Sequence, residues 1–599
     1  MFQMLDAGRE PSMPIIHSTT RASRRARAVL HAIALIVSLL FFTTGFAACP
    51  SPEPIAGSAK RLLVVSPATS QDKEHWIKFI QTLKSDPRSN DIAILFFSHQ
   101  VQFTSLGTAQ AIARELDSCI ASKMVDGHYD SITLIGHSIG GMIVRRAYLI
   151  GSGATDETPA TPAEWTRKVD RILLFASVNK GIPRDATWWS PGANWLLRLL
   201  PHPHFVLEDL AFGSDFIADT RIAWIRHFGK WSGDTNARPT HKPPYVVQFW
   251  GTVDSIVKEK DNADLEAFAG PVVVRVPGAE HGNLQRLEAE FTEDPASRWA
   301  LMRQQLFDPI PKSTPRTHRP RRLLFVVRGI RDSSNSDWVQ DLASRAEEFY
   351  EGNVEMPEYG YFTAAQFAIR PIRARNIPSF RDLYAERLAE NPRTEFDLIA
   401  HSNGTYIFGQ SAISTPSMLF RNVVLAAPVL PEEFEWTKLF RRKQIQNARY
   451  DAAQLDWPVG ILCPALRALG FWDVGPAGLV LFGTSEQMAG SHQLKKVSWY
   501  GGGHSAALTV NVAEGVDNLQ HLLNFARDGS DTNSGERVFP DSGWLAIAAR
   551  ATPYAVWMVI LAIAIGCVRR YRAGRRPTKR GVAIVVAILS LTYVLLDIM

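Results

Sequence analysis

Cysteine is scarce in this chain. Only four occur among 599 residues: Cys49, Cys119, Cys463 and Cys567. Two of them lie at or in apolar runs and the other two are far apart, so none has the close spacing typical of a zinc ligand set or a disulfide-rich scaffold. The sequence therefore predicts neither a metal site nor a disulfide framework. A low cysteine count does not exclude an oxidising compartment.

The chain also lacks the basic surface that nucleic-acid binding needs. Its net charge is +6, but eleven basic residues in two short clusters, within 21–27 and 569–580, more than account for this value. The remainder of the chain is acidic overall. Because both clusters adjoin long apolar runs, they predict membrane topology, and no nucleic-acid partner is expected.

Three apolar runs are long enough, or nearly long enough, to cross a bilayer. A disordered basic segment, 1–27, precedes a signal anchor at 28–48, and a basic loop at 569–580 separates further spans at 551–568 and 581–599. Basic flanks stay cytoplasmic, so residues 50–543 are predicted to be exoplasmic, or periplasmic if the membrane is a bacterial inner membrane. Alternatively, the first run is a cleaved signal, because Phe46-Ala47-Ala48-Cys49 resembles a lipobox.

One stretch combines an apolar strand, a tight turn and an amphipathic helix. Within residues 132–142, Gly136-His137-Ser138-Ile139-Gly140 fits the Gly-x-Ser-x-Gly nucleophile elbow. A serine at such a sharp turn requires nearly side-chain-free neighbours two positions away on either side. Ser138 is then a nucleophile, and the amide of Ile139, at a helix N-terminus, is an oxyanion donor. The alternative is a glycine-rich turn with a capping serine.

Alternating strands and helices around this stretch predict an α/β domain over 55–307. The expected strands are 61–66, 92–97, 132–136, 169–175, 245–250 and 272–276, which argues for a mostly parallel sheet with helices on both faces. A Trp- and Leu-rich segment, 184–240, interrupts the rhythm. It is predicted to be an inserted helical cap, with a peripheral core cluster as the equal alternative.

An aspartate and a histidine follow the last two predicted strands. Asp254 comes after strand 245–250, and His281 comes after strand 272–276. Together with Ser138 they give the chain order Ser…Asp…His of a catalytic triad, in which histidine carries the serine proton and the carboxylate orients the imidazole. Asp261 and Asp264 are weaker candidates for the acid.

These motifs carry a resemblance to a known family. Residues 60–305 resemble an α/β-hydrolase of the lipase/serine-esterase type, and are similar in layout to membrane-anchored deacylases of glycosylphosphatidylinositol. The resemblance rests on the motif 136–141, on the segment 175–183, and on Asp254 and His281. It implies no cofactor and no metal. Where relatives carry His-Gly at the oxyanion loop, this chain has Ser66-Pro67-Ala68-Thr69, so the second oxyanion donor is expected to be the amide of Ala68 or Thr69.

A second copy follows a proline-rich linker at 308–320. Residues 321–528 repeat the first strand (322–327) and the elbow (396–404), and are followed by a linker at 529–543. The repeat predicts a second triad of Ser402, Glu486 and His504, with oxyanion donors at Asn403 and Gly329. Asp456 and Asp473 compete with Glu486, and a non-catalytic copy is the alternative.

The sequence thus predicts a membrane-anchored serine esterase or lipase built from two tandem α/β-hydrolase domains, acting on lipid or acylated envelope esters. Two alternatives stay open. The chain is a binding or assembly protein that kept the fold and lost turnover, or the same residues transfer acyl groups to an acceptor alcohol.

Overall fold

The computed structural model describes residues 49–573 apart from 70, 100–106, 128, 156–160, 184–205, 233–241, 263–271, 288–296, 312–316, 331, 359–362, 481, 483–493, 501, 512–515 and 531–542. The predicted spans 28–48 and 581–599 lie outside these residues. We call residues 49–308 the first half and residues 317–530 the second half.

The first half is built on a seven-stranded sheet with the order β1-β3-β2-β4-β5-β6-β7, parallel except for β1. The strands are β1 (Glu53–Pro54), β2 (Arg61–Ser66), β3 (Ile92–Phe96), β4 (Ser131–His137), β5 (Val169–Phe175), β6 (Tyr245–Gly251) and β7 (Val272–Val276). The helices are α2 (Ile77–Ser85), α3 (Ala109–Gly127), α4 (Ile139–Gly151), α5 (Glu164–Arg167), α7 (Val206–Asp209), α8 (Asp215–Gly229) and α10 (Arg298–Phe307).

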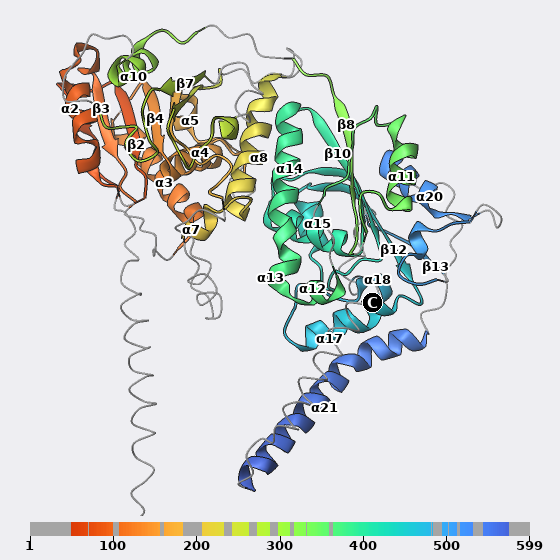
Figure 1. Ribbon diagram of the computed structural model, residues 1–599. Coiled ribbons are helices and arrows are strands. Elements are labelled where there is room, and N and C mark those ends of the chain that lie inside the picture. The colour runs from red at the N-terminus through yellow and green to blue at the C-terminus, as the bar shows by residue number, and fades with distance from the viewer. Residues whose placement is uncertain are drawn as a thin grey trace, which may run out of the picture.

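Helices cover both faces of this sheet (Figure 1), and alternating side chains of its central strands belong to two different buried clusters. In β2, Leu62 and Val64 join the core under α3, α4 and α8, whereas Leu63 and Val65 join the core under α2 and α10. A continuous apolar run with both faces covered is the signature of a parallel sheet. The predicted α/β architecture is therefore observed.

The second half has a six-stranded parallel sheet with the order β13-β12-β11-β10-β8-β9. Its strands are β8 (Arg321–Val327), β9 (Val354–Glu355), β10 (Thr394–His401), β11 (Phe420–Ala426), β12 (Ile445–Ala453) and β13 (Leu494–Tyr500), with a separate hairpin of β14 (Val510–Asn511) and β15 (Val516–Asp517). Its helices are α11 (Asp337–Glu347), α12 (Ala364–Ala368), α13 (Arg370–Arg373), α14 (Ile377–Glu390), α15 (Asn403–Ser414), α16 (Trp436–Arg441), α17 (Cys463–Ala468), α18 (Ala477–Val480) and α20 (Asn518–Asp528). Taken in sequence, β8 to β13 occupy the same neighbour positions as β2 to β7.

Strand β12 was missed by sequence analysis. Its sequence contains Arg449 and Asp451, which break the apolar run expected of a buried strand. Both side chains are almost fully buried and pair with each other, Arg449 Nη2 lying 2.8 Å from Asp451 Oδ1. The pairing neutralises charges that would otherwise be costly inside the protein, so the strand forms despite its composition.

The two halves pack together through α8 and α14, which lie side by side (Figure 1). Arg221 on α8 forms an ion pair with Asp382 on α14. Gly213 has a φ of 62°, and a Cβ there would lie 2.5 Å from Pro378 Cβ. Only glycine fits this close approach. Apolar side chains from both halves belong to one continuous buried cluster at this junction.

Helix α8 falls within the segment predicted as a cap. Nearly all of its side chains are buried, and it packs against α4 on one side and α14 on the other. This part of the segment therefore joins the two halves. Most of the Trp- and Leu-rich residues that prompted the prediction lie in 184–205, outside the described residues.

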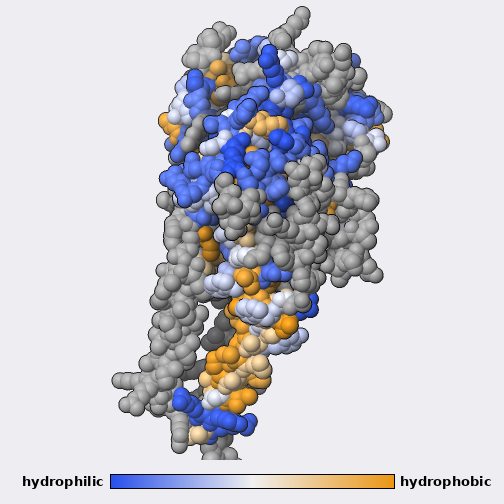
Figure 2. All heavy atoms as spheres, turned by 90° about the vertical axis from the view of Figure 1, so that its right-hand side faces the viewer, coloured by the Kyte–Doolittle hydropathy of each residue, from blue (hydrophilic) through white to orange (hydrophobic). Residues whose placement is uncertain are grey.

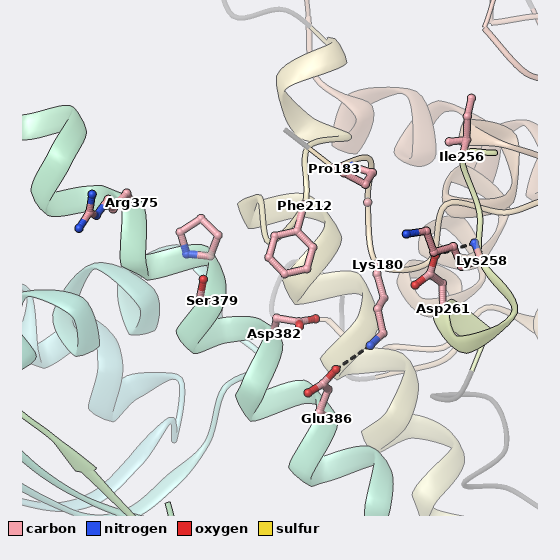
Figure 3. A pocket seen from close by; sticks show the side chains of 12 residues that line it. Lys180, Pro183, Phe212, Ile256, Lys258, Asp261, Arg375, Ser379, Asp382 and Glu386 are labelled. Carbon is pink, nitrogen blue, oxygen red and sulfur yellow. Dashed lines mark hydrogen bonds and ion pairs between the residues drawn. The ribbon is translucent and has the colours of Figure 1, made fainter. Parts of the chain in front are cut away.

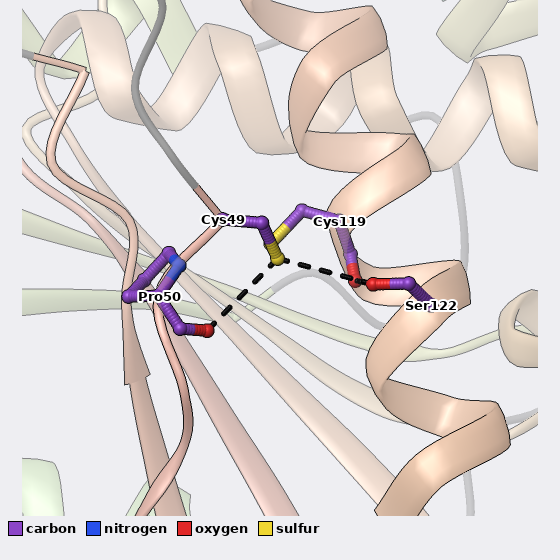
Figure 4. Close-up of a disulfide and its surroundings, with 4 residues drawn as sticks. All are labelled: Cys49, Pro50, Cys119 and Ser122. Atoms are coloured by element: carbon purple, nitrogen blue, oxygen red, sulfur yellow. Dashed lines mark hydrogen bonds between the residues drawn. A yellow bond between two sulfur atoms is a disulfide. The ribbon is translucent and has the colours of Figure 1, made fainter.

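A disulfide joins Cys49 to Cys119 on α3, which the sequence analysis did not anticipate (Figure 4). The two residues are 70 positions apart, so no local motif indicates the pairing. The bond ties the segment that precedes β1 to the first sheet's helical layer. It also occupies the Cys49 sulfur that a lipobox would need for lipidation.

The chain continues into one long helix, α21 (Trp544–Arg572). Of the described residues, only Trp544–Arg570 form a helix long and apolar enough to cross a membrane, and it contains the predicted span 551–568. Figure 2 shows an apolar column below a largely hydrophilic body, and Figure 1 shows that it projects away from the second half. The helix ends in Arg569, Arg570 and Arg572.

We expect the Cys49→Ser and Cys119→Ser variants to lose about 2–4 kcal/mol of unfolding free energy, because the bond restricts a long loop of the unfolded chain. Thermal unfolding of the purified full chain, with and without dithiothreitol, measures this loss. The reductant should lower the Tm of the wild type to that of the variants and leave theirs unchanged. Two blocked cysteines should appear in alkylation mass spectra of the wild type, and four free thiols would contradict the pairing.

Candidate active sites

The first site starts at the turn between β4 and α4. Ser138 has φ 55° and ψ −117°, a conformation that L-residues rarely adopt. Its amide donates to the carbonyl of Phe175 at 2.9 Å, which ties the turn to β5. Side-chain-free neighbours are required, because a Cβ on Gly136 would lie 2.5 Å from the Gly140 carbonyl oxygen and one on Gly140 would lie 2.1 Å from the Ser66 carbonyl oxygen. The glycines of the Gly-x-Ser-x-Gly motif are therefore required for the steric reason that the sequence analysis expected.

Ser138, His281 and Asp254 meet at the carboxyl edge of the first sheet. His281 Nε2 lies 2.9 Å from Ser138 Oγ, and His281 Nδ1 lies 3.1 Å from Asp254 Oδ2. The Asp254 side chain is fully buried, and its Oδ1 accepts hydrogen bonds from the amides of Ile256 and Val257. Burial acts to raise the pKa of Asp254, but the hydrogen bond with His281 and these amides hold it below its ordinary value. Asp254 is thus an ionised partner for His281.

Asp261 and Asp264 were the weaker candidates for the acid that contacts His281. The Asp261 carboxylate accepts a hydrogen bond from the Lys258 amide, 2.8 Å away, in a short 3-10 turn. Asp264 lies outside the described residues. The carboxylate that contacts His281 is that of Asp254.

A second histidine supports the His281 loop. His137, next to the serine, is fully buried, and its Nε2 lies 2.7 Å from the His281 carbonyl oxygen. Burial lowers the pKa of His137 to about 3, so the ring is neutral and has a single N–H to donate. Nδ1 lies 3.0 Å from Gln71 Oε1. Sequence analysis placed His137 in the motif without giving it this positioning role.

The second site repeats the arrangement. Ser402, between β10 and α15, has φ 52° and ψ −120°. His504 Nε2 lies 2.7 Å from Ser402 Oγ. Both oxygens of the buried Asp456 carboxylate lie 3.0 Å from His504 Nδ1. The structure therefore places a serine, a histidine and an aspartate in contact at both sheets.

The prediction of Glu486 as the second acid needs correction. Glu486 lies outside the described residues, and the carboxylate at His504 belongs to Asp456. Asp254 follows β6, and Asp456 follows β12, which occupies the corresponding place in the second sheet. The segment 481–486 comes later, directly after α18, rather than at the end of the acid-bearing strand. Because β12 was missed, the sequence analysis took the segment 481–486 for the strand that precedes the acid.

The other competitor in this half, Asp473, has a structural role. Its carboxylate forms an ion pair with Arg373, with Nη2 2.6 Å from Oδ1, and accepts a hydrogen bond from the Tyr406 hydroxyl at 2.9 Å. These contacts fix α13 against α15.

The predicted oxyanion donors lie beside the serines. Ile139 and Asn403 are the first residues of α4 and α15, so their amides are at helix N-termini. A Cβ on Gly329 would lie 2.9 Å from Ser402 Cβ, which places this glycine next to the second nucleophile. Ala68 is buried in the loop after β2, whose Ser66 and Pro67 carbonyls press against Gly140.

The electrostatic surroundings of His504 differ from those of His281 in the first site. His401 takes the place of His137, but its Nδ1 faces the Asp332 carboxylate at 3.5 Å instead of a glutamine. Burial acts to lower the pKa of His504, yet Asp456 and, more weakly, Asp332 raise it above the ordinary value of 6.5. The second site therefore contains two carboxylates near one imidazole.

A cavity of about 450 Å³ lies at the junction, next to the loop that carries Asp254 (Figure 3). Its first wall comes from Lys180, which follows β5, and from Ile256 and Lys258, which follow Asp254. Its second wall comes from the start of α14, including Ser379. Lys180 Nζ and Glu386 pair across it at 2.6 Å. The second half thus borders the loop that follows Asp254.

Comparisons with known proteins give fold neighbours only. No protein-family model and no curated protein matches this chain. Similar solved structures include a lipase-esterase related protein from Clostridium acetobutylicum (14% identity, 40% of this chain and 95% of that chain, TM-score 0.25). Others are a lipase from Bacillus licheniformis (14%, 39% and 91%, 0.26) and an α/β serine hydrolase without lid from Xanthomonas campestris (16%, 39% and 77%, 0.22). Each match covers about two fifths of this chain, and the function proposed below depends on the geometry of the sites.

We expect Asp456→Asn to lower the rate of fluorophosphonate labelling at Ser402 by about 10⁴-fold, because the amide favours the wrong tautomer of His504. The Ser138→Ala background removes labelling at the first site. Glu486→Gln is the matched control and should leave the rate unchanged. The reverse result would restore Glu486 as the acid.

The raised pKa of His504 predicts the pH dependence of the second site. The imidazole must be neutral to accept the Ser402 proton, so kcat/KM of the Ser138→Ala protein for a soluble ester should rise with pH through a midpoint above 6.5. Asp332→Asn removes a negative charge that favours the imidazolium, and should move the midpoint to lower pH. A midpoint that does not move would exclude Asp332 as a contributor.

Proposed function

We propose that this protein is a membrane-anchored serine hydrolase that cleaves carboxylic esters, with two tandem α/β-hydrolase domains. The observation that carries the proposal is the repeated Ser–His–Asp contact at the carboxyl edge of two sheets with the same strand order. Strained serines at both strand-to-helix turns support it, since such strain is retained mainly at functional sites.

At the first site, Ser138 Oγ attacks the ester carbonyl while His281 Nε2 takes its proton. Asp254 holds the other ring nitrogen and stabilises the imidazolium. The amide of Ile139 and one from the Ala68 or Thr69 loop stabilise the oxyanion. The imidazolium then protonates the departing alcohol oxygen, and His281 next activates a water that releases the acid from Ser138. No metal or organic cofactor enters these steps.

At the second site, Ser402, His504 and Asp456 perform the same steps, with the amide of Asn403 as an oxyanion donor. The Gly329 amide would have to leave the Asp332 carboxylate to act as the second donor. Because its surroundings differ in charge and in the inserted helices after Asp456, we propose that this site prefers a different ester.

The proposed location is the exoplasmic side of a membrane. The basic cluster that ends α21 favours the cytoplasmic side for that end of the helix, which leaves both sheets on the opposite side. The Cys49–Cys119 disulfide agrees with this placement, because disulfides persist in oxidising compartments. Lipids and acylated envelope molecules are esters available there, and we propose them as the substrate class.

Serine-probe labelling with peptide mapping tests both sites at once. We expect wild-type protein to label at Ser138 and Ser402, and each single alanine variant to lose one labelled peptide and keep the other. The double variant Ser138→Ala/Ser402→Ala should lose hydrolysis of p-nitrophenyl esters as well. Absence of both labelling and hydrolysis from folded wild-type protein would instead favour a binding protein.

A further inference from the structure

Exposed apolar side chains gather on one part of the second half. Between β12 and α18, five large apolar residues have 39–69% of their surface exposed: Leu455, Trp457, Ile461, Leu469 and Trp472. We call these five the apolar base patch. Among the described residues before α21, the other exposed large apolar residues occur singly on six separate segments: Ile77, Val125, Val253, Ile310, Phe349 and Ile369. Only the base patch is concentrated in one short stretch.

The patch is continuous with the helix proposed to cross the membrane. Leu545 and Ala549 of α21 are buried in a cluster with Val459, Cys463 and Leu466, from the π-helical turn Pro458–Leu462 and α17. Trp544 and Ile547, on the same turns of α21, are 66% and 68% exposed. Figure 1 shows α17 lying along the first part of α21, so the patch elements and the start of the helix form one surface.

The length of α21 leaves its first turns outside the hydrocarbon. Its 27 apolar-span residues extend about 40 Å at 1.5 Å per residue, whereas a bilayer core is about 30 Å thick. The excess of about 10 Å corresponds to the turns that dock on α17, before Pro553. Tryptophan is enriched at this depth, where membrane meets water, and the patch and the docking turns supply Trp457, Trp472 and Trp544.

The patch also reaches the second triad. Leu455 and Trp457 are the two neighbours of Asp456, and the Leu455 amide donates to the Gly502 carbonyl in the loop that carries His504. At the corresponding place in the first half, Val253 is the single large apolar residue exposed next to Asp254. Among the described residues, exposed apolar side chains thus flank the acid of the second site on both sides and that of the first site on one side.

From this continuity we propose that the apolar base patch rests in the outer leaflet of the membrane that α21 crosses, and that Ser402 takes bilayer-resident lipid esters directly from it. This inference rests on the proposed function and specifies the substrate of its second site. The acyl group moves from the lipid ester oxygen to Ser402 Oγ, the lipid alcohol leaves with the proton held by His504, and water then releases the fatty acid.

The position of the patch can be tested by a measurement that does not depend on enzyme activity. In full-length Cys567→Ser protein, reconstituted into phosphatidylcholine/phosphatidylglycerol nanodiscs, Trp472→Cys is labelled with an environment-sensitive fluorophore. Ile310→Cys, in the linker at the end of the molecule opposite α21, is the matched control. Phospholipids with a nitroxide near the head group should quench position 472 several-fold more than position 310. Equal quenching at the two positions would overturn the proposal. The patch would then be assigned to binding of a protein partner.

Substrate delivery is tested in the Ser138→Ala background. We expect Leu469→Asp/Trp472→Asp to lower the ratio of bilayer-ester to soluble-ester hydrolysis at least tenfold, and Ile310→Asp to leave it unchanged. An unchanged ratio in the patch variant would refute delivery from the bilayer. If the Ser138→Ala protein hydrolyses neither ester and does not label at Ser402, the hydrolase function of the second site fails, while the quenching result still decides whether the patch meets the membrane.

Discussion

The structure depends on a sharp strand-to-helix turn that holds a serine in a left-handed conformation. Ser138 and Ser402 adopt nearly identical backbone angles, and both follow a histidine and precede a glycine by two positions. Each turn is held by a hydrogen bond to the neighbouring strand, and Gly140 and Gly404 pack against the last backbone carbonyls of β2 and β8. A conformation of this kind persists only where the surroundings determine it fully, and here both surroundings are the central strands of a buried sheet.

This constraint also sets where the other site residues must come from. Once the serine is fixed above the carboxyl edge, the histidine and the acid have to follow strands that end at the same edge. β6 and β7 supply them in the first half, and β12 and β13 do so in the second. Each site also contains a second histidine, which directly precedes the serine. His137 and His401 face the backbone carbonyl of their respective site histidine, but at different distances and with different partners on the other ring nitrogen.

Sequence reasoning succeeded where the signal is local and failed where it is not. The elbows, Asp254, His281 and His504 could be found because each directly follows an apolar strand or lies in a short motif. Asp456 was weighed and set aside because its strand carries the buried Arg449–Asp451 pair, which is polar in sequence yet neutralised in the structure. The Cys49–Cys119 bond and the contacts between α8 and α14 join residues far apart in the chain, so no window of sequence indicates them. The catalytic roles themselves remain predictions that labelling can test.

The helix proposed to cross the membrane and the proposed second active site are connected through the same elements. The first turns of α21 pack in a cluster that also contains Val459, at the start of the turn that follows Asp456, and Tyr406 on the helix that begins after Ser402. A helix fixed in a bilayer therefore constrains the orientation of that site relative to the membrane plane. The first half is held to this frame by the α8–α14 junction, where charged and apolar contacts are both buried. On the proposed membrane placement, the site in the second half is the one connected directly to the spanning helix. This would give a physical reason for two sites, one acting on esters within the bilayer and the other on esters beyond it.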